Sequence, residues 1–485
     1  MRNLDVWFPV SEAQGLVKSG GLADVAKALP KALQELDKDV AIAIPGYQAL
    51  PDKEHYELVL STELEHWPHT AYQVKKTALD GVDVFVIECD KYFDRPELYA
   101  EHNRAYSDNG ERFGFFAAAS LDVLPKLGIK PSVVHANDWH TALIPFLLKV
   151  RYEHDERFAG IKSVLTVHNA IFKGIFSYPQ LEIIPELNLS GMEFLQWDPG
   201  YVSTLRAGIA FADKINAVSP NYAAELVTPL GAHGLVDDFV HRAKDLHGIV
   251  NGCDYSEWNP RNDDFLPKAY SDELEDMLQG KLAAKTLLQT ELNLPQRDIP
   301  MVGMVCRLTH QKGFHYILPI LEKFLLNDVQ VVIIGTGEPE IAAHLKDIAE
   351  QYSDKLSFVE AYSNRFAHLV EAGADFFLMP SEFEACGLNQ IYSMAYGTLP
   401  IVRQVGGLKD TVVDYDENPA QATGFGFIEP CHDALLIALQ RVVLFYLQNP
   451  TEMRQMQLRA MRKDFSWQES AKEYISMYEL ALGEN

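Results

Sequence analysis

Short runs of apolar residues alternate with longer amphipathic stretches along most of this 485-residue chain. The first run, at 4–10, is followed by a glycine-containing loop and an amphipathic stretch at 22–36, which predicts a strand and then a helix. Further short runs, rich in β-branched or aromatic residues, predict buried strands at 40–44, 82–88, 133–136, 163–168, 214–218 and 248–250.

The second half of the chain repeats this alternation more regularly. Apolar runs predict strands at 301–306, 329–335, 356–360, 374–380 and 399–403, with helices between them, including 314–326 and 338–351. This order of elements predicts an α/β fold in which helices cover both faces of a parallel sheet. Turn-forming residues at 251–264 mark a boundary, so we expect two doubly wound domains, 1–250 and 251–464.

Charge and cysteine content narrow the class of protein. The net charge is −26, which disfavours nucleic acid and anionic membranes as partners, so any phosphate site must be a local basic exception. The five cysteines are scattered without a C-x-x-C pair, which argues against a disulfide framework or a zinc knuckle and fits free thiols in a reducing cytoplasm. No run of about 20 apolar residues predicts a membrane span.

The loop Lys18-Ser19-Gly20-Gly21 lies between the first predicted strand and helix. Adjacent glycines let backbone N–H groups approach an anion, the helix adds its positive end, and Lys18 adds a full charge. A strand–helix turn with a surface lysine explains the same residues, so the loop alone leaves the phosphate hypothesis open.

Two further loops follow strands of the second domain. Arg307 and Lys312 place two cations at the end of the strand 301–306, where a diphosphate leaving group needs positive charge. Glu384 precedes Gly387 and a predicted helix at 390–396. The helix start suits a phosphate and the carboxylate suits sugar hydroxyls, although a helix cap with incidental acids is the simpler explanation of this loop.

Two histidine-containing loops follow strands of the first domain. The segments His135–His140 and Thr166–Asn169 contain histidines and an aspartate that could suggest a metal, but tight H-x-x-x-H or H-x-H spacing is absent and no metal site is favoured. We expect instead a polar rim with an exposed Trp139 suited to stacking on a sugar.

These motifs occur together, in this order, in one family. The chain resembles the bacterial glycogen synthases and plant starch synthases over essentially its full length; these are retaining GT-B glucosyltransferases that use ADP-glucose. The residues that carry the resemblance are Lys18–Asp24, Asn137–His140, Thr166–Asn169, Asn251–Asp254 with Trp258–Pro260, Arg307–Gly313, Glu384–Gln390 and Val405–Val412. It implies two Rossmann-like domains facing across a deep cleft, with a helix at 465–485 crossing back to the first domain.

The resemblance also implies a role for each matching position. Arg307 and Lys312 would bind the diphosphate, Glu384 would hold glucose hydroxyls, and His168 would contact the glucose 6-hydroxyl. Further donor contacts would come from Lys18, Gly20, Gly21, Asp24, Cys386, Gly387 and Leu388, with Tyr362 stacking on adenine. The acceptor α-1,4-glucan would lie on Asp138, Trp139, His140 and Asn169, together with Tyr99.

The implied chemistry needs no cofactor and no metal. The acceptor 4-hydroxyl would attack on the face from which the diphosphate leaves, and a phosphate oxygen would take its proton, so paired carboxylates at glycosidase positions are not required. UDP-glucose remains an alternative donor, and a sugar-nucleotide epimerase is a second enzyme class on the same fold. A non-catalytic glucan-binding protein should have lost Lys18, Arg307, Lys312 or Glu384, and all of these residues are present.

Overall fold

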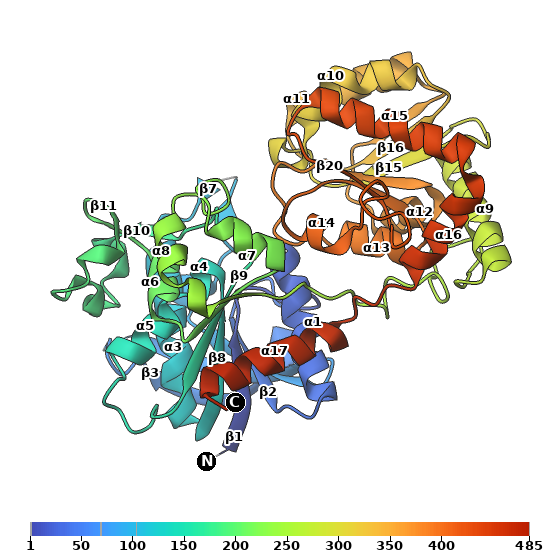
Figure 1. Ribbon diagram of the computed structural model, residues 1–485. Helices are drawn as coiled ribbons and strands as arrows, with labels where there is room; N and C mark the ends of the chain where they lie inside the picture. Colours follow the sequence, from blue (N-terminus) through green and yellow to red (C-terminus); the bar gives the residue numbers. More distant parts are fainter. Residues whose placement is uncertain (1, 68–69, 103, 485) are drawn as a thin grey trace. The chain divides into compact units, whose positions relative to one another are not determined.

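The computed structural model describes residues 2–67, 70–102 and 104–484, and the chain forms two compact units (Figure 1). The first unit comprises Met1–Gly252 and Trp467–Asn485, and the second comprises Cys253–Ser466. Each unit contains a largely or wholly parallel sheet with helices packed on it, so the predicted α/β class is confirmed.

The sheet of the first unit has nine strands, ordered β14-β13-β9-β8-β1-β2-β5-β4-β3. The strands from β14 to β5 are parallel, and they are β14 (Leu246–Gly248), β13 (Lys214–Ala217), β9 (Lys162–Val167), β8 (Ile129–Asn137), β1 (Arg2–Pro9), β2 (Val40–Pro45) and β5 (Val82–Glu88). All six residues of β2 are buried, which explains its continuous apolar run.

The parallel sheet predicted for this unit is extended at one edge by antiparallel strands that the sequence pattern did not predict. Strands β4 (Ala71–Leu79) and β3 (Glu57–Glu63) form an antiparallel extension beyond β5. A second, small antiparallel sheet contains β10 (Ile175–Ser177), β12 (Tyr201–Ser203) and β11 (Gln196–Asp198). These strands are short or half-exposed, so they lack the apolar run by which the buried strands were predicted.

The helices of the first unit alternate with its strands along the chain. They are α1 (Gly21–Glu35), α2 (Asp90–Phe93), α3 (Asn109–Lys126), α4 (Asp138–Thr141), α5 (Leu143–Val150), α6 (Thr204–Phe211), α7 (Pro220–Leu226) and α8 (Val236–His241). None of the helices among the described residues of the chain is long and apolar enough to cross a membrane.

The last helix, α17 (Trp467–Leu482), belongs to the first unit and lies beside α1 (Figure 1). The Tyr478 hydroxyl lies 2.7 Å from Nδ1 of His135 in β8, and Asn216 in β13 donates a 2.9 Å hydrogen bond to the Tyr474 hydroxyl. The chain therefore enters and leaves the second unit through two segments, and these are joined by a β-bridge between Cys253 and Ser466.

The second unit has a parallel six-stranded sheet ordered β17-β16-β15-β18-β19-β20. Its strands are β15 (Met301–Val305), β16 (Gln330–Ile334), β17 (Leu356–Val359), β18 (Phe376–Met379), β19 (Leu399–Arg403) and β20 (Phe425–Phe427). Its helices are α9 (Leu274–Glu291), α10 (Phe314–Leu325), α11 (Pro339–Gln351), α12 (Asn364–Gly373), α13 (Asn389–Ala395), α14 (Gly406–Thr411), α15 (His432–Gln448) and α16 (Pro450–Met461).

Both sheets reverse their strand order at one point. In the first unit β1 lies between β2 and β8, and in the second β15 lies between β16 and β18. Loops diverge at such a reversal, which leaves a crevice at the carboxyl ends of the two central strands where open α/β sheets bind ligands. In each unit the loops at this point are therefore the expected place for a ligand.

Candidate functional site

Asp138 joins the ends of two neighbouring strands in the first unit. It follows β8 directly, is 7% exposed and has a left-handed φ of 51°. Its Oδ1 accepts hydrogen bonds from the backbone N–H groups of His168, at 2.7 Å, and Asn169, at 3.3 Å. The acid thus fixes the loop after β9 against the loop after β8, and three of the predicted site residues come together here.

Burial sets the charge state of these groups. Desolvation raises the pKa of Asp138 to about 7, although the His168 and Asn169 N–H groups oppose this change and nearby Glu12 adds to it. Burial lowers the pKa of His168 to about 3 and that of His140 well below its usual value. Both imidazoles are therefore neutral near pH 7, and Nε2 of His168 lies 3.0 Å from Oδ1 of Asn137.

Trp139 is half-buried, which corrects the prediction of an exposed ring. Its ring centroid lies 3.9 Å from that of His140, 5.0 Å from Phe113 and 5.4 Å from Phe176 in the small sheet. Tyr99 completes the group, with its ring 4.7 Å from His140. The aromatic residues predicted for the acceptor side therefore lie together, but part of the Trp139 surface is used for packing.

The glycine-containing loop after β1 is hydrogen-bonded to a carboxyl group of the same chain, that of Glu12. Oε2 of Glu12 accepts hydrogen bonds from the backbone N–H groups of Ser19 and, at 3.0 Å, Gly20. Lys18 is exposed and forms a 2.6 Å ion pair with Asp24 in the first turn of α1. The sequence pattern missed Glu12, whose only signal was an acid seven residues before Ser19.

Gly21 leaves open space beside the same loop. A Cβ atom placed on it would meet no heavy atom within 4 Å, and its φ is not in the left-handed region. Packing within the protein therefore does not require glycine at this position, whereas the close approach of a ligand would.

In the second unit, the loops after β15 and β18 meet through an ion pair. Nζ of Lys312 lies 2.5 Å from Oε2 of Glu384, and the Ser381 hydroxyl donates a 3.0 Å hydrogen bond to the same oxygen. Arg307 directly follows the β15 region and is exposed, and its guanidinium makes no hydrogen bond or ion pair with the described residues. One cation is thus neutralised by the acid and the other is available.

Glycines allow these loops to approach closely. A Cβ atom on Gly313, which has a φ of +84°, would lie 2.1 Å from the carbonyl oxygen of Pro380. One on Gly406, with a φ of +42°, would lie 1.9 Å from the carbonyl oxygen of Glu384. The backbone that carries Lys312 and Glu384 is therefore held by contacts that no other residue type permits.

The other predicted donor contacts lie around the same strands. Cys386 is buried, and Gly387 adopts a φ of +73° just before Leu388 and α13. The side chain of Asn389 donates a 2.7 Å hydrogen bond to the carbonyl oxygen of Val305 at the end of β15. Tyr362 is 85% exposed in the loop after β17, so β16 separates its strand from β15.

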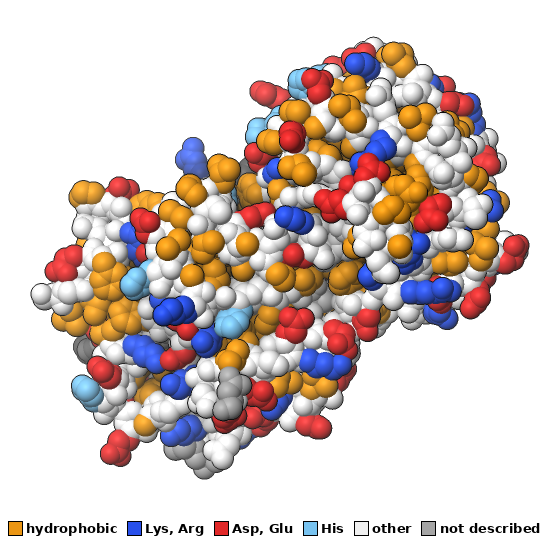
Figure 2. Space-filling model, in the orientation of Figure 1, with side chains coloured by type: hydrophobic (Ala, Val, Ile, Leu, Met, Phe, Trp, Pro, Cys, Tyr) orange, Lys and Arg blue, Asp and Glu red, His pale blue; other side chains and the backbone are white. Residues whose placement is uncertain are grey.

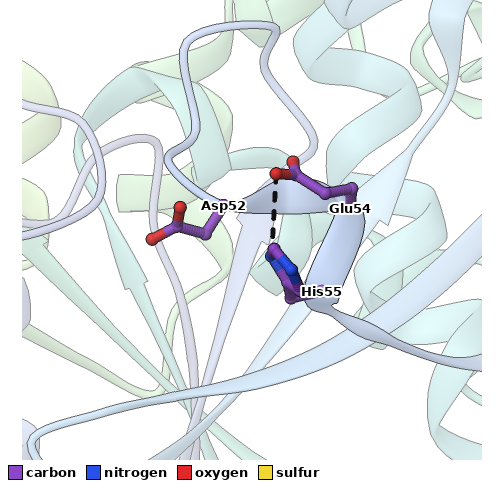
Figure 3. A group of neighbouring side chains, drawn as sticks. All are labelled: Asp52, Glu54 and His55. Carbon is purple, nitrogen blue, oxygen red and sulfur yellow. Dashed lines mark ion pairs between the residues drawn. The ribbon is translucent and has the colours of Figure 1, made fainter.

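A grouping with the spacing of metal ligands occurs elsewhere among the described residues. Asp52, Glu54 and His55 lie close together on one exposed turn, and Nδ1 of His55 is 3.6 Å from Oε1 of Glu54 (Figure 3). Exposed acidic groups of this kind are common in proteins without a bound metal. On the face drawn in Figure 2, acidic and basic side chains are interspersed over both units.

Comparison with known proteins gives matches along nearly the whole chain. Residues 5–241 match the starch synthase catalytic domain, and residues 290–463 match glycosyl transferases group 1. A glycogen synthase of Vibrio cholerae serotype O1 is 72% identical over 481 residues, covering 99% of each chain, and one of Vibrio atlanticus is 58% identical over 481 residues, again covering 99% of each.

A solved structure matches the arrangement of the fold as well. The catalytic domain of starch synthase IV from Arabidopsis thaliana, bound to ADP and acarbose, superposes with a TM-score of 0.87 at 30% identity. The match covers 99% of this chain and 100% of that domain. The two-domain α/β arrangement is therefore the GT-B fold of that enzyme.

Proposed function

The chain belongs to the glycogen synthase family of glycosyltransferases, and on that premise we propose that it transfers glucose from ADP-glucose to the non-reducing 4-hydroxyl of an α-1,4-glucan. The anomeric configuration is retained. The observation that carries the proposal is the Lys312–Glu384 pair at the strand-order reversal of the second unit, with the exposed guanidinium of Arg307 on the same loop as Lys312.

The donor diphosphate binds between these cations. Lys312 exchanges its ion pair with Glu384 for a phosphate oxygen, and Arg307 meets the second phosphate. Glu384 is then released to accept hydrogen bonds from glucose hydroxyls. Because negative charge builds on the diphosphate as the glycosidic bond breaks, two cations fixed beforehand stabilise the transition state more than the ground state.

The remaining donor contacts come from both units. Tyr362 stacks on the adenine, and Cys386, Gly387 and Leu388 lie by the phosphates at the start of α13. In the first unit we assign Lys18, with its partner Asp24, and the two glycines to the donor. Gly21 leaves open space for it. The N–H of Gly20 is bonded to Glu12, so this residue serves the donor only by having no side chain in the way. The ADP bound to the starch synthase IV relative supports a donor of this class.

The acceptor glucan lies on the first unit. It contacts the loops at the carboxyl ends of two strands and the loop before α3. The residues are Asp138, Trp139 and His140 after β8, Asn169 after β9, and Tyr99 before α3. Aromatic rings beside polar groups suit the apolar faces and hydroxyl edges of pyranose units, and the rings of Trp139 and Tyr99 each lie tilted against that of His140. Acarbose, an oligosaccharide analogue, is bound to the same relative.

No protein base is required for the transfer. The C1–O bond to the diphosphate breaks, the C1–O4 bond to the acceptor forms on the same face, and the acceptor proton passes to the leaving phosphate oxygen. His168 is neutral because of its lowered pKa, so it serves the glucose 6-hydroxyl as a hydrogen-bonding group and not as a cation. The step needs neither a metal nor a cofactor.

Isotope-labelled ADP-glucose and UDP-glucose, each offered with glycogen, test the proposal. We expect glucose incorporation from ADP-glucose. Incorporation from UDP-glucose alone would move the donor assignment to the alternative, and incorporation from neither, or epimerised nucleotide sugar as the product, would contradict it. We place the reaction in the cytoplasm, which the five free thiols support.

A further inference from the structure

Glu12 lies in the loop between β1 and α1 and is only 4% exposed. Its Oε2 accepts the backbone N–H groups of both Ser19 and Gly20, the residue that caps α1. These are the N–H groups that a glycine-rich anion loop would direct at a phosphate. A carboxylate of the chain itself therefore occupies part of the predicted anion site.

The burial of Glu12 indicates that it is a permanent part of the loop. Withdrawing the Ser19 and Gly20 N–H groups from this buried carboxylate would remove two of its hydrogen bonds and leave the one from Tyr99, which is unfavourable in a nearly solvent-free place. Burial raises the pKa of Glu12, and these two N–H groups oppose that rise by stabilising the ionised form. A donor phosphate that took these two N–H groups would leave the Tyr99 hydroxyl as the hydrogen-bonding partner of a buried carboxylate that also faces the charge of Asp24.

The contacts of Glu12 also connect the two sides of the proposed site. The preceding residue, Ser11, places its hydroxyl 2.8 Å from the Tyr99 hydroxyl on the acceptor side. On the other side, the loop that Glu12 holds carries Lys18, which is paired with Asp24. One short segment after β1 thus supports Tyr99 and Lys18 together.

We propose that Glu12 is a positioning residue of the donor site, whose carboxylate holds the loop 18–21 so that Lys18 and the open face of Gly21 meet the donor diphosphate. The Ser19 and Gly20 N–H groups donate their hydrogen bonds to Glu12 and are not phosphate ligands. This inference rests on the proposed function, because it concerns the same donor. It adds a residue that acts through Lys18 and does not itself touch the substrate.

The test measures binding of ADP to the full-length protein by titration calorimetry. The variants are Glu12→Ala, Glu12→Gln, Lys18→Ala and the double variant Glu12→Ala/Lys18→Ala. Asp213→Asn is the matched control. Asp213 is a carboxylate in the same unit that likewise accepts a backbone N–H, from Ser163 at 2.8 Å, but this bond lies at the beginning of β9, at the opposite end of the strand from His168 and Asn169.

A positioning role predicts a specific pattern. Glu12→Ala should weaken ADP binding about tenfold or more, as a displaced binding group does. In the Lys18→Ala background the same change should alter binding by no more than about twofold, since both residues act through one loop. Glu12→Gln, which keeps an acceptor oxygen, should retain part of the affinity. Asp213→Asn should bind ADP as the native chain does, even where it lowers the melting temperature equally.

Three results would overturn the inference. Tighter ADP binding by Glu12→Ala would show that the carboxylate is a placeholder that the phosphate displaces. Unchanged binding would remove Glu12 from the site, and additive effects of Glu12→Ala and Lys18→Ala would make the two residues independent. If the native chain itself bound no ADP, the proposed function would fail and this inference with it, whereas native binding with any of the three results overturns the inference alone.

Discussion

Lys312 and Glu384 form an ion pair with Nζ 2.5 Å from Oε2, although they lie 72 positions apart in the sequence. Their side chains are only 19% and 12% exposed, and they belong to the loops after β15 and β18, the strands that flank the strand-order reversal. A largely shielded pair at this point is worth little for stability, because desolvation offsets the attraction between the charges. Its value lies in holding a cation and an acid ready for a ligand.

Lys312→Ala should lower kcat about a hundredfold or more, because a cation directed at the leaving diphosphate contributes mainly in the transition state. The melting temperature should fall as well, because Glu384 then keeps only the Ser381 hydrogen bond in a largely shielded place, so kcat is compared well below the unfolding range. Rates with ADP-glucose and glycogen, measured beside thermal unfolding, check this prediction. Lys346→Ala is the matched control: Lys346 forms an equally short 2.5 Å pair with Glu360, but both side chains are exposed. Equal losses of activity in the two variants would contradict the role of Lys312.

Asp138 makes stability depend on pH. Burial raises its pKa from 3.8 to about 7, so between about pH 4 and 7 the folded chain keeps a proton that the unfolded chain has lost. Stability from this group therefore falls as the pH rises through that window, by up to about 4 kcal/mol in the limit. Asp138→Asn is neutral throughout and should lack this fall.

Urea unfolding of the native chain and of Asp138→Asn at pH 4.5, 6 and 7.5 measures the effect. We expect the free energy of unfolding of the variant, relative to the native chain, to increase with pH. Burial lowers the pKa of His168 and His140, so their contribution to stability rises with pH in this same window; it is common to both chains and cancels in the difference between them. Glu12 raises the pKa of Asp138, so the apparent midpoint belongs to the pair. A difference that is constant with pH would show that Asp138 is ionised in the folded chain.

The sequence predicted those parts of the fold that depend on complete burial. Strands such as β2 and β16 are buried at every residue, and this makes their apolar runs conspicuous. The alternating strand β4 was missed because only part of it is buried, and the parallel sheet predicted for the first unit is therefore mixed at that edge.

The candidate site was predicted less completely, for a related reason. Its loops were found because each follows a predicted strand, and ligand-binding loops lie at strand ends. Contacts across the fold left no local signal. The bond from Asn389 to Val305 spans 84 positions, and the hydrogen bonds of Glu12 depend on a loop that folds back on itself. Trp139 was expected to be exposed because the sequence does not show that Phe113 and Phe176 pack on it.

Trp139 should therefore contribute to stability as well as to the acceptor side. Trp139→Ala removes ring contacts with Phe113, Phe176 and His140, and should lower the free energy of unfolding by about 3 kcal/mol. Trp139→Phe keeps an apolar ring and should cost less than about 1.5 kcal/mol. Denaturant unfolding of both variants checks this. Native stability in Trp139→Ala would show that the ring serves the glucan alone.

Packing within the protein requires glycine at position 313 but not at position 21, so alanine at these two positions should have different effects. Gly313→Ala places a Cβ atom 2.1 Å from the Pro380 carbonyl oxygen at a φ of +84°, so we expect it to destabilise the second unit and to lower expression or melting temperature.

Gly21→Ala meets no heavy atom within 4 Å and lies in the first turn of α1, where alanine is the better helix former, so its melting temperature should be equal or higher. If the donor diphosphate approaches this loop as proposed, the added methyl group has nothing to strike except the donor. The KM for ADP-glucose should then rise while the KM for glycogen stays the same. A native KM for ADP-glucose in Gly21→Ala would mean that the open face of the loop is not used, and the donor contacts proposed for the first unit would then rest on Lys18, Asp24 and Gly20.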